Sequence, residues 1–448
     1  MIRALLRPLL ICLLLPGAAL AVDPPKVTIE SVTSPGGITA WLWRDETVPV
    51  ISIQAAARGG SRLDPKPGVS RLMNVLTGTT AGNYDPVGFV RQFESLSASL
   101  AINRTPAYDQ ISIRMIRDKR DDSADLIALS LTQRVIPDAA ILQGRTTLKR
   151  QLQADQRQPG VRAEQTLAAL FLGDRVPMIT TPLLPRVDDI TRDDMMAVSR
   201  DRLTRANLSV AVAGAISPAE LAPLLDRLFG KLPPGEVAPP LPTFPERPQP
   251  GFYHVPVPGA PQSSLVTVLP GLDRRDADFW PAAILEHVLG GATFTSRLKI
   301  ELREKRGMVY STGSALRYGG LRPTWVTTAA MAPGRVAEAI AITKRLWAEL
   351  RDGGITQDEL DAARDYYLGA SIVSLTSTGA MADFVGRLQL DGLPPTYYDD
   401  RRALLAGLTL ERVNAAAKRL IDPDALVIIA AGETTPDLPP SLPLPPGF

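Results

Sequence analysis

Two segments of the 448-residue chain repeat one pattern without a gap, at a constant offset of 218 residues. The first is ITRDDMMAVSRDRLTRANLSVAVAG (190–214) and the second is LTLERVNAAAKRLIDPDALVIIAAG (408–432). Each gives a threonine at a helix start, apolar residues at helical spacing, a polar break and an apolar run that ends in Ala-Gly. An internal duplication is the simplest explanation, and it predicts two domains of one design.

A proline-dense stretch separates the two copies. It reads LPPGEVAPPLPTFPERPQPG (232–251), a composition that favours extended backbone over a packed core. The stretch PDLPPSLPLPPGF (436–448) has the same character, and we expect it to be loosely ordered. The predicted organisation is a signal segment (1–21), an N-terminal domain (22–231), a linker (232–251), a C-terminal domain (252–435) and a proline-rich tail (436–448).

In both halves, strand-like runs come first and helical patterns follow. In the first half the predicted strands are 37–44, 50–57 and 110–116, and the predicted helices are 120–135 and 138–157. In the second half the predicted strands are 264–270, 308–316 and 323–331, and the predicted helices are 335–352 and 356–374. This order predicts an α+β fold in which each domain is a mostly antiparallel sheet with helices packed on one face.

The first 21 residues, MIRALLRPLLICLLLPGAALA, are typical of a secretory signal. Arg3 and Arg7 form a basic start, an apolar core follows, and Ala-Leu-Ala (19–21) supplies small residues for cleavage. The alternative is an uncleaved membrane anchor, although the apolar run is short for a span and Pro16 interrupts it. We therefore expect an exported protein that is periplasmic after cleavage.

Charge and cysteine usage narrow the function classes. The chain has 49 Lys and Arg against 47 Asp and Glu, and removal of Arg3 and Arg7 with the signal leaves these counts equal. A near-neutral chain offers no basic footprint for nucleic acid. The single cysteine, Cys12, lies in the signal, so we expect neither disulfides nor thiol chemistry. No later apolar run reaches the length of a spanning helix, so no membrane span is expected in the mature chain.

The most specific stretch of the chain is LEHVLGGATFTSRLKIELREKRGMVYSTGSAL (285–316). Its pattern predicts a helix, a Gly-Gly break, a second helix that stops at Gly307, and a strand that starts at Met308. The Gly-Gly, Ser-Arg-Leu, Leu-Arg-Glu-Lys-Arg-Gly and Tyr-Ser succession resembles the second domain of the pitrilysin/insulinase-type (M16 family) metallopeptidases. The resemblance extends over essentially the whole mature chain, and it implies two domains with the fold of LuxS and mitochondrial processing peptidase.

Active members of that family carry His-x-x-Glu-His on an early helix. The two histidines lie on one helix face and bind zinc, the glutamate activates water, and a later helix supplies a third ligand. The early helix corresponds to GVSRLMNVLTG (68–78), aligned on Gly68, and the later helix to RTTLKRQLQADQRQPG (145–160), aligned on Pro159. The residues at the ligand and base positions are then Arg71, Asn74, Val75 and Gln151.

None of these four residues suits its position. Arginine stays protonated, valine has no donor atom, an amide cannot act as a general base, and Gln151 is at best a weak neutral ligand. After the signal the chain has only two histidines, His254 and His287, both in the second half. We therefore expect no metal and no cofactor in this chain. An active zinc peptidase with atypical ligands is an alternative that the missing histidines disfavour.

The pair Glu286-His287 could suggest a metal site outside the family's zinc positions. Residues adjacent in sequence do not share a helix face, so they cannot chelate one ion well. We expect His287 to be a helical histidine near a domain surface, and we assign no role to His254.

Arg303 and Tyr310 match a functional pair of the family. In active relatives, an arginine and a tyrosine seven residues apart in the second domain contact the substrate and stabilise the oxyanion of the tetrahedral intermediate. From the residues alone, a solvated charge and an ordinary strand aromatic are the more economical interpretation. The resemblance favours function instead, because this pair is kept while the metal set is lost.

The resemblance implies a specific role. Some bacterial members of the family are heterodimers in which one subunit holds zinc and its partner supplies the arginine–tyrosine pair. We expect this chain to be the zinc-less subunit, inactive alone, acting in trans on peptides bound with a zinc-bearing M16-type partner. The alternative is a structural or peptide-binding module without a catalytic role, as in the cytochrome bc1 core relatives.

Overall fold

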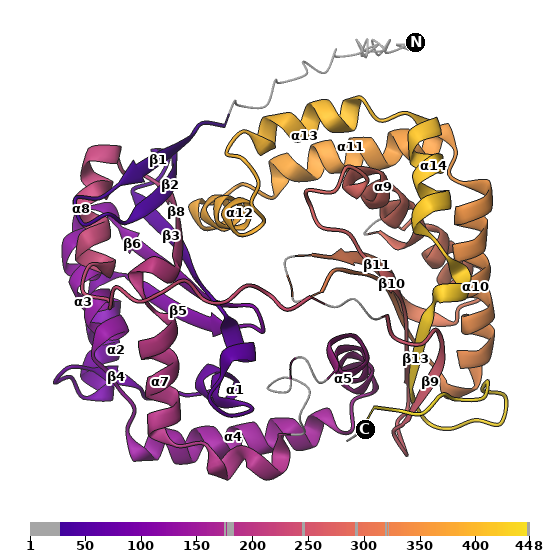
Figure 1. Ribbon diagram of the computed structural model, residues 1–448, viewed down its shortest axis with the longest axis horizontal. Coiled ribbons are helices and arrows are strands. Elements are labelled where there is room, and N and C mark those ends of the chain that lie inside the picture. The colour runs from indigo at the N-terminus through magenta and orange to yellow at the C-terminus, as the bar shows by residue number, and fades with distance from the viewer. Residues whose placement is uncertain are drawn as a thin grey trace, which may run out of the picture.

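The computed structural model describes residues 27–173, 176, 183–243, 247–291, 294–318, 320 and 322–445. The predicted signal segment (1–21), with Cys12, lies outside these residues. The described chain forms two α+β halves, each built on one sheet (Figure 1). Among the helices in these ranges, none combines the length and the hydropathy that crossing a bilayer requires.

The first half is built on a six-stranded sheet in the order β1-β2-β8-β3-β6-β5. Its strands are β1 (Ile29–Thr33), β2 (Thr39–Arg44), β3 (Val50–Arg58), β5 (Ser99–Arg104), β6 (Tyr108–Ile116) and β8 (Leu208–Gly214). A small second sheet pairs β4 (Thr80–Ala81) with β7 (Arg134–Val135). The helices are α1 (Val69–Asn74), α2 (Pro86–Leu96), α3 (Arg120–Thr132), α4 (Asp138–Asp155), α5 (Pro159–Leu172), α7 (Arg192–Arg202) and α8 (Pro218–Phe229).

The second half is built on a five-stranded sheet in the order β11-β12-β10-β13-β9. Its strands are β9 (Gly251–Pro256), β10 (Ser263–Pro270), β11 (Val309–Arg317), β12 (Thr324–Met331) and β13 (Val427–Gly432). Its helices are α9 (Phe279–Gly290), the π-helix η6 (Lys299–Glu304), α10 (Val336–Gly353), α11 (Gln357–Val373), α12 (Thr378–Leu390), α13 (Tyr397–Ala406) and α14 (Leu410–Leu420).

The two sheets share one connectivity. The series β2-β8-β3-β6-β5 corresponds to β9-β13-β10-β12-β11, and β2–β8 and β9–β13 are the parallel pairs. The repeated sequence segments form α7 with β8 and α14 with β13. Thr191 and Thr409 cap their helices as predicted, accepting hydrogen bonds from the backbone N–H groups of Asp194 and Arg412. The predicted α+β class is confirmed, and the common connectivity supports the duplication.

One helix from each half packs on the sheet of the other half. This exchange was not predicted from the sequence. The first half's own α3 and α8 cover one face of its sheet, while α12 lies across the other face beside β8 and β3 (Figure 1). There the hydroxyls of Ser52 and Thr378 are 2.9 Å apart. In return, α5 packs Ala163, Leu167 and Phe171 against β9, β10 and β13. Helices of a half's own sequence therefore cover one sheet face, and an exchanged helix covers the other.

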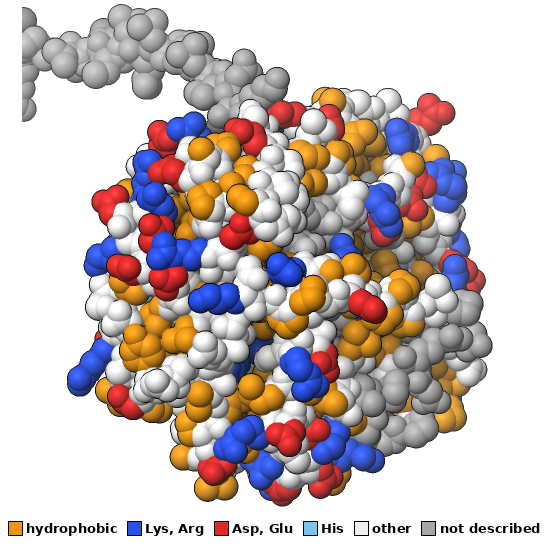
Figure 2. All heavy atoms as spheres, turned by 60° about the vertical axis from the view of Figure 1, so that its left-hand side comes forward, with side chains coloured by type: hydrophobic (Ala, Val, Ile, Leu, Met, Phe, Trp, Pro, Cys, Tyr) orange, Lys and Arg blue, Asp and Glu red, His pale blue; other side chains and the backbone are white. Residues whose placement is uncertain are grey.

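The proline-dense segments lie along the surface of the two halves. The described linker residues before β9 contain neither helix nor strand, and Ala238 N–H donates to Asn207 Oδ1 over 2.9 Å. The tail is more ordered than expected, because Leu442 N–H donates to the Phe252 carbonyl of β9 over 2.7 Å. On the face shown in Figure 2, basic and acidic side chains are interspersed, as the near-equal charge counts lead one to expect.

Candidate functional site

The helix that aligns with the family's zinc-binding helix is short. It follows Gly68, whose φ of 86° is left-handed and where an added Cβ would lie 2.2 Å from Leu183. The buried side of α1 belongs to an apolar cluster shared with α4 and α7. The helix ends at Asn74, and Val75 is its C-cap with φ −104° and ψ 0°. The two histidine-equivalent positions, 71 and 75, therefore do not lie on one continuous stretch of helix.

The structure brings α1 and α4 together as the alignment requires. Arg71 forms an ion pair with Asp155, the last residue of α4. Gln151 is exposed one turn earlier on α4, at a spacing that shares a helix face with Asp155. The two predicted ligand-bearing helices are thus neighbours, but a cation and a carboxylate meet between them.

Asn74 fastens α1 to the edge of the sheet. Its Nδ2 donates to the Arg104 carbonyl and its Oδ1 accepts from the Arg104 N–H, both over 3.0 Å, at the end of β5. Val75 packs, partly buried, against the apolar cluster beneath α1. An ion-paired guanidinium, an amide engaged at both ends and an aliphatic side chain do not fit a zinc ion. Over the described ranges, no group of three or more His, Cys, Asp or Glu could hold a metal ion.

A buried ion cluster lies directly under α1. The Arg202 guanidinium of α7 is 3.0 Å from Asp64 Oδ1 and 3.0 Å from Asp109 Oδ2, and all three side chains are at most 4% exposed. Asp64 also accepts from the Ser70 N–H at 2.7 Å and from the Ser70 hydroxyl at 2.5 Å. Burial raises the pKa of both carboxyls, with Arg202 acting in the opposite direction. This cluster ties α1 to α7 and to β6.

Arg303 and Tyr310 lie side by side in the second half. The Arg303 guanidinium is 5.6 Å from the centroid of the Tyr310 ring and 5.2 Å from that of Phe294. Tyr310 is 86% exposed and Phe294 67% exposed. Tyr310 belongs to β11, the outermost strand of its sheet. The structure thus presents a cation and two exposed aromatic rings next to a strand edge, and among the described residues Arg303 forms no ion pair.

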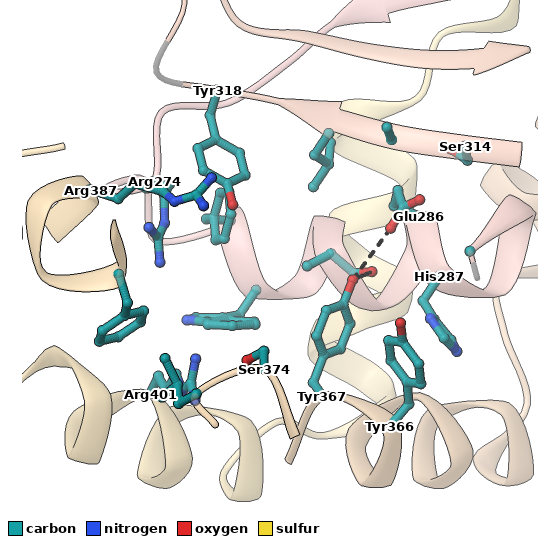
Figure 3. Close-up of a pocket in the computed structure, with 18 of the residues that line it drawn as sticks. Arg274, Glu286, His287, Ser314, Tyr318, Tyr366, Tyr367, Ser374, Arg387 and Arg401 are labelled. Carbon is teal, nitrogen blue, oxygen red and sulfur yellow. Dashed lines mark hydrogen bonds between the residues drawn. The ribbon is translucent and has the colours of Figure 1, made fainter. Parts of the chain in front are cut away.

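A cavity of about 650 Å³ lies between β11 and the helices α9, α11, α12 and α13. Figure 3 shows its labelled arginines, Arg274, Arg387 and Arg401, at one end and Glu286 with His287 at the other. Aromatic side chains line the space between these ends. Sequence reasoning missed this cavity, because its residues are scattered from 274 to 401 and share no motif.

Glu286 and His287 are buried at the inner end of this cavity. His287 is 6% exposed and its ring lies 4.3 Å from the Tyr366 ring, so the expectation of a surface position is wrong. The reason is that α9 packs among β11, α14, α11 and α10, so nearly every residue of α9 is buried. The Tyr367 hydroxyl donates to Glu286 Oε2 over 3.3 Å (Figure 3). Burial raises the pKa of Glu286 to about 7.

Replacing Glu286 with glutamine should remove a fall in stability near neutral pH. The folded state holds the Glu286 proton up to a pKa of about 7, whereas the unfolded chain loses it at 4.5. Between these values the folded state binds more protons, so the free energy of unfolding decreases as pH rises, by up to about 3 kcal/mol. Urea denaturation at pH 5 and pH 8 should show this decrease in the wild type and not in Glu286→Gln. The exposed Glu304→Gln is the control, and equal pH slopes for wild type and Glu286→Gln would contradict the assignment.

Comparisons with known proteins agree with the fold. Residues 189–367 match the family model described as the peptidase M16 inactive domain. An uncharacterized zinc protease of Streptomyces coelicolor is 29% identical over 160 residues, which are 36% of this chain and 35% of that protein. The alignment thus spans about a third of that relative's length.

Two further matches extend over most of the chain. The probable mitochondrial-processing peptidase subunit beta of Schizosaccharomyces pombe is 21% identical over 80% of this chain and 81% of that protein. The crystal structure of a peptidase M16 inactive domain from Pseudomonas fluorescens superposes with a TM-score of 0.84 and 23% identity, covering 92% of this chain and 100% of that one. At this identity, the structural match shows a common fold.

Proposed function

We propose that this chain, a homologue of the M16 peptidases that matches their inactive domain over residues 189–367, is the non-catalytic subunit of an exported peptidase pair. In this proposal, Arg303 and Tyr310 act in trans on a peptide bound together with a zinc-bearing partner subunit. The observation that carries it is a contrast between the halves. Arg71 and Asn74, at zinc-equivalent positions, are engaged in an ion pair and in backbone hydrogen bonds, while the partly exposed Arg303 lies beside the exposed Tyr310 at a strand edge.

The chemistry of the pair suits a substrate amide. A guanidinium donates charge-assisted hydrogen bonds to a carbonyl oxygen and binds it more strongly as negative charge develops there. The tyrosine hydroxyl adds a further donor. On β11, the edge opposite β12 has no strand partner among the described residues, so an extended peptide could pair with it as an added strand. Tyr310, 86% exposed, would then lie next to the peptide backbone.

The proposal assigns zinc to the partner and none to this chain. Arg71, Asn74, Val75 and Gln151 supply no set of ligands for a zinc ion. The signal-like segment 1–21 supports export, and a periplasmic location follows from it as part of the same proposal.

Purification of the chain alone and with a partner that carries an intact His-x-x-Glu-His helix tests the proposal. We expect substoichiometric zinc and no peptide hydrolysis for the isolated chain. We expect stable co-purification and hydrolysis by the pair that exceeds that of the partner alone. Stoichiometric zinc together with hydrolysis by the isolated chain would overturn the proposal and favour a peptidase with atypical ligands.

A further inference from the structure

Among the described residues, one guanidinium of the cavity beside β11 forms no ion pair with a carboxylate. Arg274 is paired with Asp391 at 2.9 Å, and Arg387 is paired with Asp383 one turn away on α12. Arg401 of α13 forms no ion pair with any described residue, and its Nη2 atom is buried without a hydrogen-bond partner. Leaving a buried charged donor unpaired is costly, so a ligand that pairs with it gains that energy on binding.

The environment of Arg401 holds it in place. Its guanidinium lies 4.6 Å from the centroid of the Tyr398 ring and 5.7 Å from that of Phe384. These rings pack against the guanidinium, while its Nη2 atom has no hydrogen-bond partner among the described residues. Burial lowers the pKa of Arg401, but a guanidinium stays protonated in proteins. Arg401 therefore presents a fixed, charged hydrogen-bonding edge.

Two other residues that line the cavity also have a buried hydrogen-bond donor without an acceptor among the described residues. Arg274 Nε and Trp280 Nε1 are buried and have no hydrogen-bond partner among the described residues. With Arg401 Nη2, they make three donors and no acceptor. A carboxylate accepts hydrogen bonds and donates none, so it complements this set, whereas an ammonium group would not.

Aromatic rings line much of the rest of the cavity beside polar groups such as Ser314 and Asp383, and the cavity is suited in size to a small organic group. The rings of Phe279 and Tyr318 pack edge to face with their centroids 5.3 Å apart, and those of Trp280 and Tyr367 do so at 5.7 Å. A volume of about 650 Å³ lies within the usual range of small-molecule sites. Glu286 at the far end donates a proton when neutral and accepts from Tyr367.

We propose that the cavity between β11, α9, α11, α12 and α13 binds an organic carboxylate with an aromatic or aliphatic body, its carboxylate group held by Arg401. A free peptide C-terminus and an acidic side chain both supply this chemistry. The residues that line the cavity do not include Arg303 or Tyr310, so ligand binding there does not depend on a role for Arg303 in a peptidase pair. Ser314 to Leu316 of β11 line it, so it lies next to the strand edge proposed above to hold peptides.

Calorimetric titration of the full chain with N-acetyl-L-phenylalanine tests the inference. We expect saturable binding of this acid and no measurable binding of N-acetyl-L-phenylalaninamide, which lacks the charge. N-acetyl-L-aspartyl-L-phenylalaninamide, whose only carboxylate is on a side chain, distinguishes the two sources. Binding of this compound would show that an acidic side chain can be the ligand. If it does not bind while N-acetyl-L-phenylalanine does, the ligand is a peptide C-terminus.

The variant Arg401→Gln should weaken binding of the acid by about 10- to 100-fold, the usual effect of losing a hydrogen bond to a charged partner. Arg401→Lys keeps the charge but not the planar edge, and it should lose less. Arg402→Gln is the matched control, since Arg402 follows on α13 and does not line the cavity. Thermal melting shows whether each variant folds. Equal binding of acid and amide, binding of neither, or unchanged affinity in folded Arg401→Gln would overturn the inference.

Discussion

Replacing Arg303 with alanine should lower kcat of the peptidase pair by about 10²- to 10³-fold, the usual effect of removing one oxyanion-stabilising donor. The loss should fall on kcat more than on KM, because the guanidinium binds the oxygen more strongly as charge develops on it. The side chain is only partly buried and forms no ion pair with the described residues, so its removal should leave the fold intact. Steady-state kinetics of the reconstituted pair, with equal zinc content in both preparations, measures the effect.

The control for this variant is Arg306→Ala, three residues further along the same segment. Arg306 is committed to an ion pair with Glu301 at 2.8 Å and lies away from the Arg303–Tyr310 contact. Its removal should change kcat by less than about twofold, because Glu301 keeps its ion pairs with Lys305 and Arg345 and Arg306 has no place in the proposed substrate contact. If Arg303→Ala and Arg306→Ala are equally active, Arg303 has no role in trans, and the chain is better described as a structural or peptide-holding module.

Replacing Arg202 with leucine should destabilise the first half by about 3–5 kcal/mol, because it leaves the carboxylates of Asp64 and Asp109 buried without their cation. Asp64 and Asp109 are 0% and 1% exposed, so water cannot easily take the place of the guanidinium. The hydrogen bond from Arg202 Nη2 to the Ser70 hydroxyl, 2.8 Å, is lost as well. Urea denaturation at pH 7 measures the free energy of unfolding.

Arg200→Leu on the same helix serves as the control for Arg202→Leu. Arg200 is 69% exposed and pairs with its neighbour Asp201, so the expected change is within about 0.5 kcal/mol. The loss in Arg202→Leu should also shrink at acid pH, where protonation of the two buried carboxyls removes their uncompensated charge. A loss no larger than that of Arg200→Leu would show that the cluster does not stabilise this half.

Elements with strong local patterns could be predicted from the sequence. The predicted strands 50–57 and 264–270 are β3 and β10 to within a residue, and the predicted helices 138–157 and 335–352 are α4 and α10 to within two residues. The edge strand β5 was missed, because its residues are mostly partly buried or exposed and it lacks the apolar run that marks the inner strands. Alternation of apolar residues indicates that one face of a strand is buried, and the side chains of this edge strand are mostly not buried.

Long-range partnerships could not be predicted. The amphipathic pattern of α5 requires a buried face, but it does not say which sheet provides the cover. Asp64, Asp109 and Arg202 are far apart in the sequence, and each alone looks like an ordinary surface charge. Arg401 likewise carries no sequence signal, since its importance lies in the absence of a nearby described carboxylate. Arg303 and Tyr310 lie close together because they are seven positions apart in the sequence, on either side of a turn at Gly307.

The exchange of α5 and α12 bears on how such a molecule could arise. The two helices stand at equivalent positions of the duplicated sequence, so their exchange has the symmetry of an isologous contact within one polypeptide. In a single ancestral half, one face of the sheet would be exposed to solvent and one helix would have no sheet to pack on. Two copies could bury both surfaces by exchanging this helix, as in domain swapping. The proline-dense linker joins the swapped copies into one chain. That fusion fixes the ratio of the two halves at one to one. The halves also stay associated when the protein is diluted, because their association is intramolecular and no longer depends on protein concentration.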